Sequence, residues 1–384
     1  MSLELEKKPA QATPNGSKPV AAPEGEAPLA GASPKPRYRV LGTLRFLLAL
    51  MVAVHHGRHL GGGTLLVLDQ YSIASSAVYA FFVLSGYVIA EANCSFYLGR
   101  PGKFILNRIL RIDPPYYAAV LISALFHFII VKTALLPVVG SKPPDDIFGV
   151  GNIAGNILVM WIWYGLKALG LAPTYYFFLY AWTLVVECKF YLAAAIIYWV
   201  ATRPNQFLQR YAVPGGITVM MLLHLGGHLK PALWRDFAYV PYFVLGMCIY
   251  YAVQRGSRLA AVGIAISAYA AWRHFLVEMS TVNYQNNFIW WLFVSLVVAL
   301  GVLSYMRPNP KLRKLDKFLG DLTYPLYLNH FIVVILFAAY TRPGSDLTVV
   351  IYLCAAIVFS YLMSFTTEPF TKKLRDRIRG VSLG

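Results

Sequence analysis

The chain has 384 residues, of which 58% are hydrophobic and only 13% are charged, so it has too little charge to cover a soluble globular protein. The composition therefore indicates a membrane protein with several spans. A formal net charge of +17 would indicate nucleic-acid binding in a soluble domain, but most Lys and Arg residues lie in short segments between apolar runs. That placement excludes nucleic acid, is typical of charges that orient membrane spans, and is compatible with an anionic-ligand site.

Residues 1–36 differ from the rest of the chain. They are rich in Pro, Ala, Gly and Glu and nearly free of aromatic residues, so they are predicted to form a disordered cytoplasmic tail. No signal peptide is apparent, because the first apolar run begins only near residue 40. Lys35, Arg37 and Arg39 precede that run and are expected to keep the N-terminus in the cytoplasm.

The first apolar run, 41–59, is long enough to enter a bilayer as a helix, yet it carries Arg45 near one end and His55 and His56 near the other. His56 follows Arg45 by eleven positions, which is about three turns plus 20°, so both lie on one face roughly 16 Å apart along the axis. Ionisable groups in a span cost several kcal/mol and indicate a site. The alternative is that Arg45 extends to the inner interface and His56 lies in water at the outer one.

Nine further apolar runs are predicted to cross the membrane. One of them follows Pro114 and Pro115, which are expected to begin a helix, and reaches roughly 135. The others lie at 74–93, 175–201, 212–229, 237–254, 258–277, 285–306, 319–341 and 347–366. The segment 150–170 is apolar but short, and if it does not cross, the basic residues of the later loops all fall in the cytoplasm. We therefore predict an all-α integral membrane fold, a bundle of about ten transmembrane helices with a re-entrant or interfacial segment near 150–170 and both termini cytoplasmic.

The four cysteines are far apart and lie inside or beside apolar runs, without the spacing of a metal site. We expect them to be core residues, with neither a disulfide framework nor a bound metal. They are Cys94, Cys188, Cys248 and Cys354.

Two arginines in the sequence LNRILR suit a phosphate ligand. Arg108 and Arg111 are three residues apart on a predicted helix, so both side chains project from one face at the cytoplasmic mouth of the bundle. A guanidinium group is a planar fork of donors that matches phosphate oxygens, and only Asp113 lies nearby to compete for it. The alternative is ordinary basic charge on the cytoplasmic side of a span.

Two further ionisable residues fall inside predicted spans. Glu187 would have to be protonated or to find a partner there, so it is either a site residue or a buried hydrogen-bonding residue. His330 lies in a run that also contains Pro325, and a kink at that proline is expected to line a cavity. The alternative for His330 is a structural hydrogen bond.

Five motifs, in order along the chain, are similar to those of the acyltransferase-3 family of integral-membrane acyltransferases, which O-acylate extracytoplasmic glycans and other hydroxyl acceptors. The resemblance covers about 38–370, and Thr183 stands where the family usually has Ser. The motifs are Arg45 with His56, FFVLSGYVI at 81–89, Arg108 and Arg111 followed by Ile112 and Pro114, AWTLVVECKFYL at 181–192, and TYPLYLNH at 323–330.

The resemblance implies that an acyl-CoA from the cytoplasm is the co-substrate and that a hydroxyl on the other side of the membrane is the acceptor. Arg45, Arg108 and Arg111 are then expected to bind the phosphates of CoA. Histidine suits general-base work near neutral pH, so His56 is the expected catalytic residue together with Glu187, either as a base or through an acyl-histidine. Candidates to support these groups or to contact a substrate are Ser85, Tyr191 and His330.

The expected organisation is a membrane domain at 37–370 and a basic cytoplasmic tail at 371–384, without a fused hydrolase-like domain. The resemblance also implies a bacterial-type inner membrane and an acetyl group as the default acyl group. The acceptor could be exopolysaccharide, O-antigen, peptidoglycan or a smaller sugar, free or lipid-linked. Polysaccharide-assembly proteins are the expected protein partners.

Two other classes of function are compatible with parts of the sequence. A secondary transporter or flippase of an anionic lipid-linked sugar would use the same arginines without covalent chemistry. A structural membrane scaffold would leave Arg45, His56 and Glu187 unexplained in their apolar runs.

Overall fold

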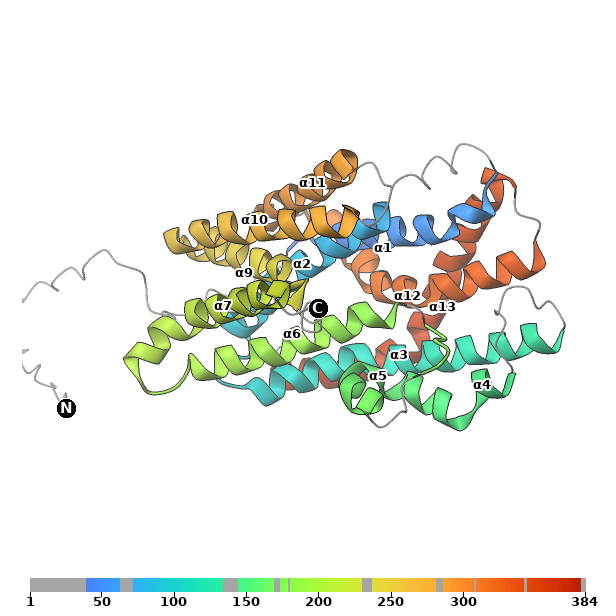
Figure 1. Ribbon diagram of the computed structural model, residues 1–384, viewed down its shortest axis with the longest axis horizontal. Helices are drawn as coiled ribbons and strands as arrows, with labels where there is room; N and C mark the ends of the chain where they lie inside the picture. Colours follow the sequence, from blue (N-terminus) through green and yellow to red (C-terminus); the bar gives the residue numbers. More distant parts are fainter. Residues whose placement is uncertain are drawn as a thin grey trace, which may run out of the picture.

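The computed structural model describes residues 39–62, 72–133, 144–168, 173–178, 180–229, 237–280, 286–306, 309–341 and 344–380. Within these ranges the regular structure is helical and contains no strand, and most helices run along the long axis of the molecule (Figure 1). The predicted tail at 1–36 lies outside the described residues. The helices are α1 (Gly42–Gly57), η1 (Arg58–Leu60), α2 (Ile73–Ser95), α3 (Pro101–Lys132), α4 (Pro144–Phe148), α5 (Val150–Ala168), α6 (Ala181–Val200), α7 (Gln206–Leu229), α9 (Val240–Arg255), α10 (Arg258–Ser280), α11 (Asn286–Tyr305), α12 (Pro310–Tyr340) and α13 (Asp346–Arg379).

The prediction of an all-α membrane fold is confirmed. In the described part of the chain, seven helices are long and apolar enough to cross a membrane, namely α2, α3, α6, α10, α11, α12 and α13. A span needs about 20 apolar residues, whereas α1 and α9 have 16 residues each, so the bundle of about ten spans stays a prediction. The described part of the segment near 150–170 forms α5, and its path relative to the membrane also stays a prediction.

The expectation that Pro114 and Pro115 begin a helix is wrong. Both prolines lie inside α3, which begins at Pro101 and runs through Arg108 and Arg111 without interruption. A proline inside a helix removes a backbone hydrogen bond, and membrane helices tolerate this where neighbouring helices satisfy the freed groups. The freed carbonyl oxygens are those of Leu110 and Arg111, and at the next residue the hydroxyl group of Tyr324, on α12, donates to the carbonyl oxygen of Ile112 at 3.0 Å and joins α12 to α3.

Helices α1 and α12 run parallel and in register. At one end the carboxylate of Asp316 accepts hydrogen bonds from the backbone N–H groups of Gly42, at 3.1 Å, and Thr43, at 2.7 Å, and so caps the start of α1 from another helix. At the other end His56 meets His330 at the same sequence separation of 274 residues that joins Gly42 to Asp316. This register aligns the whole functional face of α1 with α12.

Arg39 joins four parts of the fold at the start of α1. Its guanidinium group donates to the carboxylate of Glu91 on α2 at 3.0 Å, to the side-chain oxygen of Gln254 on α9 at 2.7 Å, and to the backbone carbonyl of Ser304 on α11 at 3.1 Å. An arginine has five donors, so one residue can satisfy partners on three helices. Arg39 thus fixes the end of the bundle at which α1 begins.

Helices α2 and α9 cross in direct backbone contact. A Cβ atom on Gly246 would lie 1.8 Å from the carbonyl oxygen of Val83, and one on Gly86 would lie 2.0 Å from that of Phe243. The crossing therefore requires glycine at both positions. Because α2 also carries Ser85, this contact sets the depth of a site residue.

Replacing Gly246 with Ala is expected to destabilise the protein by about 1–3 kcal/mol, the usual cost of overpacking, because backbone atoms must move apart. Gly301 on α11 is the matched control, since a Cβ atom there meets nothing within 4 Å and alanine favours helix. The measurement is the temperature at which detergent-solubilised protein loses its monodisperse peak in size-exclusion chromatography. Equal temperatures for the two variants would contradict the proposed crossing.

Candidate active site

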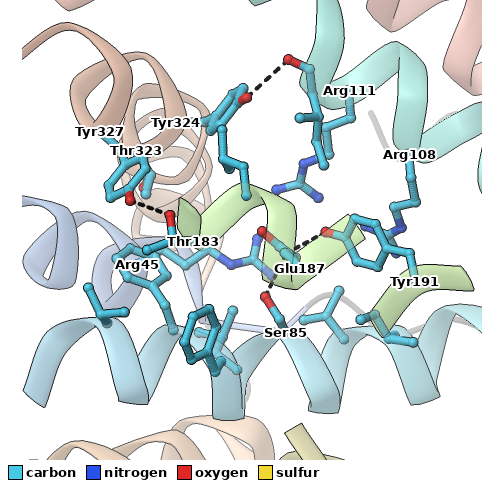
Figure 2. A pocket seen from close by; sticks show the side chains of 18 of the residues that line it. Arg45, Ser85, Arg108, Arg111, Thr183, Glu187, Tyr191, Thr323, Tyr324 and Tyr327 are labelled. Carbon is cyan, nitrogen blue, oxygen red and sulfur yellow. Dashed lines mark hydrogen bonds between the residues drawn. The ribbon is translucent and has the colours of Figure 1, made fainter. Parts of the chain in front are cut away.

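A pocket with about 900 Å³ of empty space, its mouth included, lies between α1, α2, α3, α6 and α12. Arg45 from α1 and Arg108 and Arg111 from α3 converge on it around Glu187 of α6 (Figure 2). Its apolar wall comes mainly from α2. The other lining residues are Val78, Phe81, Phe82, Leu84, Ser85, Val88, Ile89, Ile112, Thr183, Leu184, Tyr191, Gly320, Thr323, Tyr324 and Tyr327.

Glu187 is held by two hydroxyl groups. Ser85 donates to its Oε1 atom at 2.8 Å, and Tyr191, one turn further along α6, donates to the same oxygen (Figure 2). The sequence singled out all three residues, and the structure brings them together. Two donors to one carboxylate oxygen fix the place of Glu187 in the wall.

The pocket carries a surplus of positive charge, because three guanidinium groups and one carboxylate line it. Within the described residues, the guanidinium groups of Arg45 and Arg111 make no hydrogen bond or ion pair, and both line the pocket. Arg108 is 5% exposed, and its guanidinium group lies over the rings of Phe104, at 5.1 Å, and Tyr191, at 5.2 Å. Guanidinium donors that face a cavity suit an anion such as a phosphate. The three arginines predicted to share a ligand therefore share a pocket.

His56 and His330 form a hydrogen-bonded pair. Nδ1 of His56 lies 2.9 Å from Nε2 of His330, and Nδ1 of His330 lies 3.1 Å from the carbonyl oxygen of Leu326, which can only accept. In neutral His330 the proton is therefore on Nδ1 and Nε2 accepts. His56 then donates through its own Nδ1, and its Nε2 keeps a lone pair that can take a proton.

Tyr180, the residue before α6, covers this histidine pair. Its ring stacks on His56 with 4.0 Å between centroids and lies 5.8 Å from the ring of His330. No motif in the sequence singles out Tyr180, and its role depends on contacts between helices. A stacked aromatic ring limits the rotation of the imidazole and so holds the lone pair of His56 in one direction.

Two asparagines of α5 hold the segment that leads to Tyr180. The side-chain oxygen of Asn152 accepts from the backbone N–H groups of Thr174, at 2.9 Å, and Tyr175, at 3.0 Å, and that of Asn156 accepts from Phe177 at 3.1 Å. Both side-chain amides also donate to the carbonyl oxygen of Tyr175, at 3.0 and 2.8 Å. The segment near 150–170 is thus a scaffold for the loop beside the histidines.

The structure separates the two residues that were predicted to be catalytic together. His56 pairs with His330, whereas Glu187 lies among the arginines, and neither histidine lines the pocket. At the start of α6, Thr183 and Glu187 follow Tyr180, the residue before the helix, at spacings of three and four residues and so share one face with it. This face leads from the histidine pair to the arginine pocket, and Thr183 stands between them.

A family model for an acyltransferase domain, acyltransferase-3, matches residues 40–365. The chain belongs to the acyltransferase-3 family. As an acyltransferase-3 protein it is a multi-pass membrane acyltransferase, and the matched range contains the whole arginine pocket and the histidine pair. Searches of curated proteins and of solved structures found no match.

Proposed function

We propose that this acyltransferase moves an acyl group, by default acetyl, from cytoplasmic acyl-CoA to a hydroxyl of an extracytoplasmic glycan such as exopolysaccharide or O-antigen. One observation supports this most strongly: the arginine pocket and the histidine pair lie at two levels of the same two helices, α1 and α12. An anion site and a proton acceptor stacked along one path suit a donor with phosphates at one end and a thioester at the other.

The arginine pocket supports CoA as the donor. Three guanidinium groups offer paired donors to phosphate oxygens, and the surplus positive charge favours a polyanion over a neutral ligand. Arg45 and His56 are separated by roughly 16 Å along α1, so a long, narrow arm must connect the anionic end of the donor to the reacting group. The pantetheine arm of CoA has this shape.

The histidine pair supports a base-catalysed transfer. Nε2 of His56 takes the proton of the acceptor hydroxyl, the acceptor oxygen bonds to the thioester carbon, and the carbon–sulfur bond breaks. The proton on His56 then passes to the leaving sulfur. In an acyl-histidine route the same nitrogen attacks the carbon first, and labelled acyl protein after acid quenching distinguishes that route from direct transfer.

The arrangement of basic residues supports an orientation with both termini in the cytoplasm of a bacterial-type cell, in the inner membrane. Arg39 lies where α1 begins, and the basic C-terminal part of α13 contacts the start of α3, where Asn107 donates to the backbone of Arg375 at 3.2 Å. Lys311, Arg313 and Lys314 begin α12 beside the same end of α1. Basic residues gathered at one end of a bundle are typical of the cytoplasmic side.

The test uses purified protein reconstituted in vesicles, with labelled acetyl-CoA supplied on one side and a hydroxyl-bearing polysaccharide on the other. We expect label on the polysaccharide only when the donor is on the side of the basic end, which site-specific proteolysis identifies. Movement of unmodified, lipid-linked sugar without transfer of label would instead indicate a transporter. Polysaccharide-assembly proteins that present the acceptor are the expected partners in the cell.

A further inference from the structure

One hydrogen bond between two helices lies between the arginine pocket and the histidine pair. The hydroxyl group of Thr183 donates to the carbonyl oxygen of Tyr180 at 2.9 Å. It therefore accepts from the hydroxyl group of Tyr327, which lies 2.5 Å away (Figure 2). Thr183 and Tyr327 are both buried and both line the pocket. Their bond joins α6 to α12 at the end of the pocket nearest the histidines.

The ring of Tyr327 fills the space between the two parts of the site. It packs against Phe81 of the pocket wall, with 6.3 Å between centroids, and against Phe178, with 6.0 Å. Its centroid is also 6.2 Å from that of His330. The ring therefore contacts both the wall of the arginine pocket and the histidine pair.

Separation of this kind has a chemical use. A thioester beside a base reacts with water as well as with the intended hydroxyl, and an enzyme suppresses this side reaction by excluding water until the acceptor is bound. In this side reaction the oxygen of water bonds to the thioester carbon and the carbon–sulfur bond breaks. The products are a free carboxylic acid and the thiol of CoA.

We propose that Tyr327, held by Thr183, is a positioning residue that keeps the acyl thioester away from His56 until the acceptor is present. This inference rests on the proposed function. Binding of the acceptor turns the Tyr327 ring away from Thr183, and the acyl group then passes to the histidine pair. The hydrogen bond between Thr183 and Tyr327 makes this movement of the ring rare when no acceptor is bound.

The test compares Tyr327→Phe and Thr183→Val, each of which removes the hydrogen bond, with Thr183→Ser, which keeps a hydroxyl group able to make both contacts. The measurement is the rate at which acetyl-CoA releases free thiol without acceptor, divided by the rate of transfer with acceptor. We expect both bond-deleting variants to raise this ratio several-fold and Thr183→Ser to restore the wild-type ratio. The double variant should equal either single variant, because all three lack the same bond.

An unchanged ratio in both single variants would overturn the inference, as would a raised ratio in Thr183→Ser. If Tyr327→Phe is not recovered folded, Thr183→Val decides the outcome, since it leaves the tyrosine ring in place. The proposed function fails separately: in that case wild-type protein neither releases thiol nor labels the polysaccharide. If wild-type protein transfers the label and the variants hydrolyse no more acetyl-CoA than it does, the proposed role of Tyr327 is rejected and the proposed function stands.

Discussion

Replacing His56 with Ala is expected to lower the kcat of acyl transfer by about 10²- to 10⁴-fold, the range that a general base contributes. The change removes the lone pair that the hydrogen bond from His56 to His330 leaves available. The protein should stay folded in membranes, because the change removes one hydrogen bond and one ring stack while Asp316 still caps the other end of α1. The measurement is the initial rate with saturating acetyl-CoA and acceptor.

His55 is the matched control for this prediction. It is the preceding residue on α1, so its side chain points about 100° away, and His55→Ala should have a milder effect. His330 separates orientation from chemistry, since Gln can still accept from Nδ1 of His56 whereas Leu cannot. We expect His330→Gln to retain more activity than His330→Leu. Near-normal turnover in His56→Ala would reject the assignment of the base.

Loss of one arginine of the pocket is expected to raise the KM for acetyl-CoA roughly ten- to hundred-fold with kcat nearly unchanged. Each guanidinium group should contribute about 1.5–3 kcal/mol through charge-assisted hydrogen bonds. The phosphates lie far from the bond that forms, so their contacts are the same in the ground state and the transition state. Arg111→Lys should recover only part of the affinity, because a point charge replaces a fork.

Arg111→Ala gives the clearer result of the two arginine variants, because Arg108 also packs against Phe104 and Tyr191 and its loss disturbs the pocket wall. Lys103 is the matched control, since it is an exposed cation two turns earlier on α3 and does not line the pocket. Lys103→Ala should leave the donor KM within about twofold if only contact charges matter. If Arg108→Ala and Arg111→Ala keep the wild-type KM for the donor but lose acceptor binding, the donor binds outside the arginine pocket.

The helices could be predicted from the sequence better than their ends. The run 41–59 became α1 almost as expected, because an apolar run of that length has few other stable structures in lipid. In contrast, α12 begins nine residues before the predicted span at 319, and α13 continues to Arg379, well past 366. Hydropathy marks where a helix leaves the lipid, whereas a charged helix can continue into water.

The site could be predicted in part. The common face of Arg45 and His56 follows from the period of one helix, and so does the pairing of Glu187 with Tyr191. Contacts between helices, such as His56 with His330, depend on the register of α1 against α12. That register follows from close approach at Gly42 and capping by Asp316, which no local pattern in either helix specifies.

In the loop before α6, side chains make the hydrogen bonds to the backbone that a neighbouring strand would make in a β-sheet. Asn152 and Asn156 satisfy backbone groups from Thr174 to Phe177, and Ser123 donates to the carbonyl oxygen of Phe177 at 2.8 Å. Irregular backbone is tolerated at membrane depth only when protein satisfies its polar groups. Three polar side chains therefore allow a non-helical turn beside the histidines without a supply of water to solvate it.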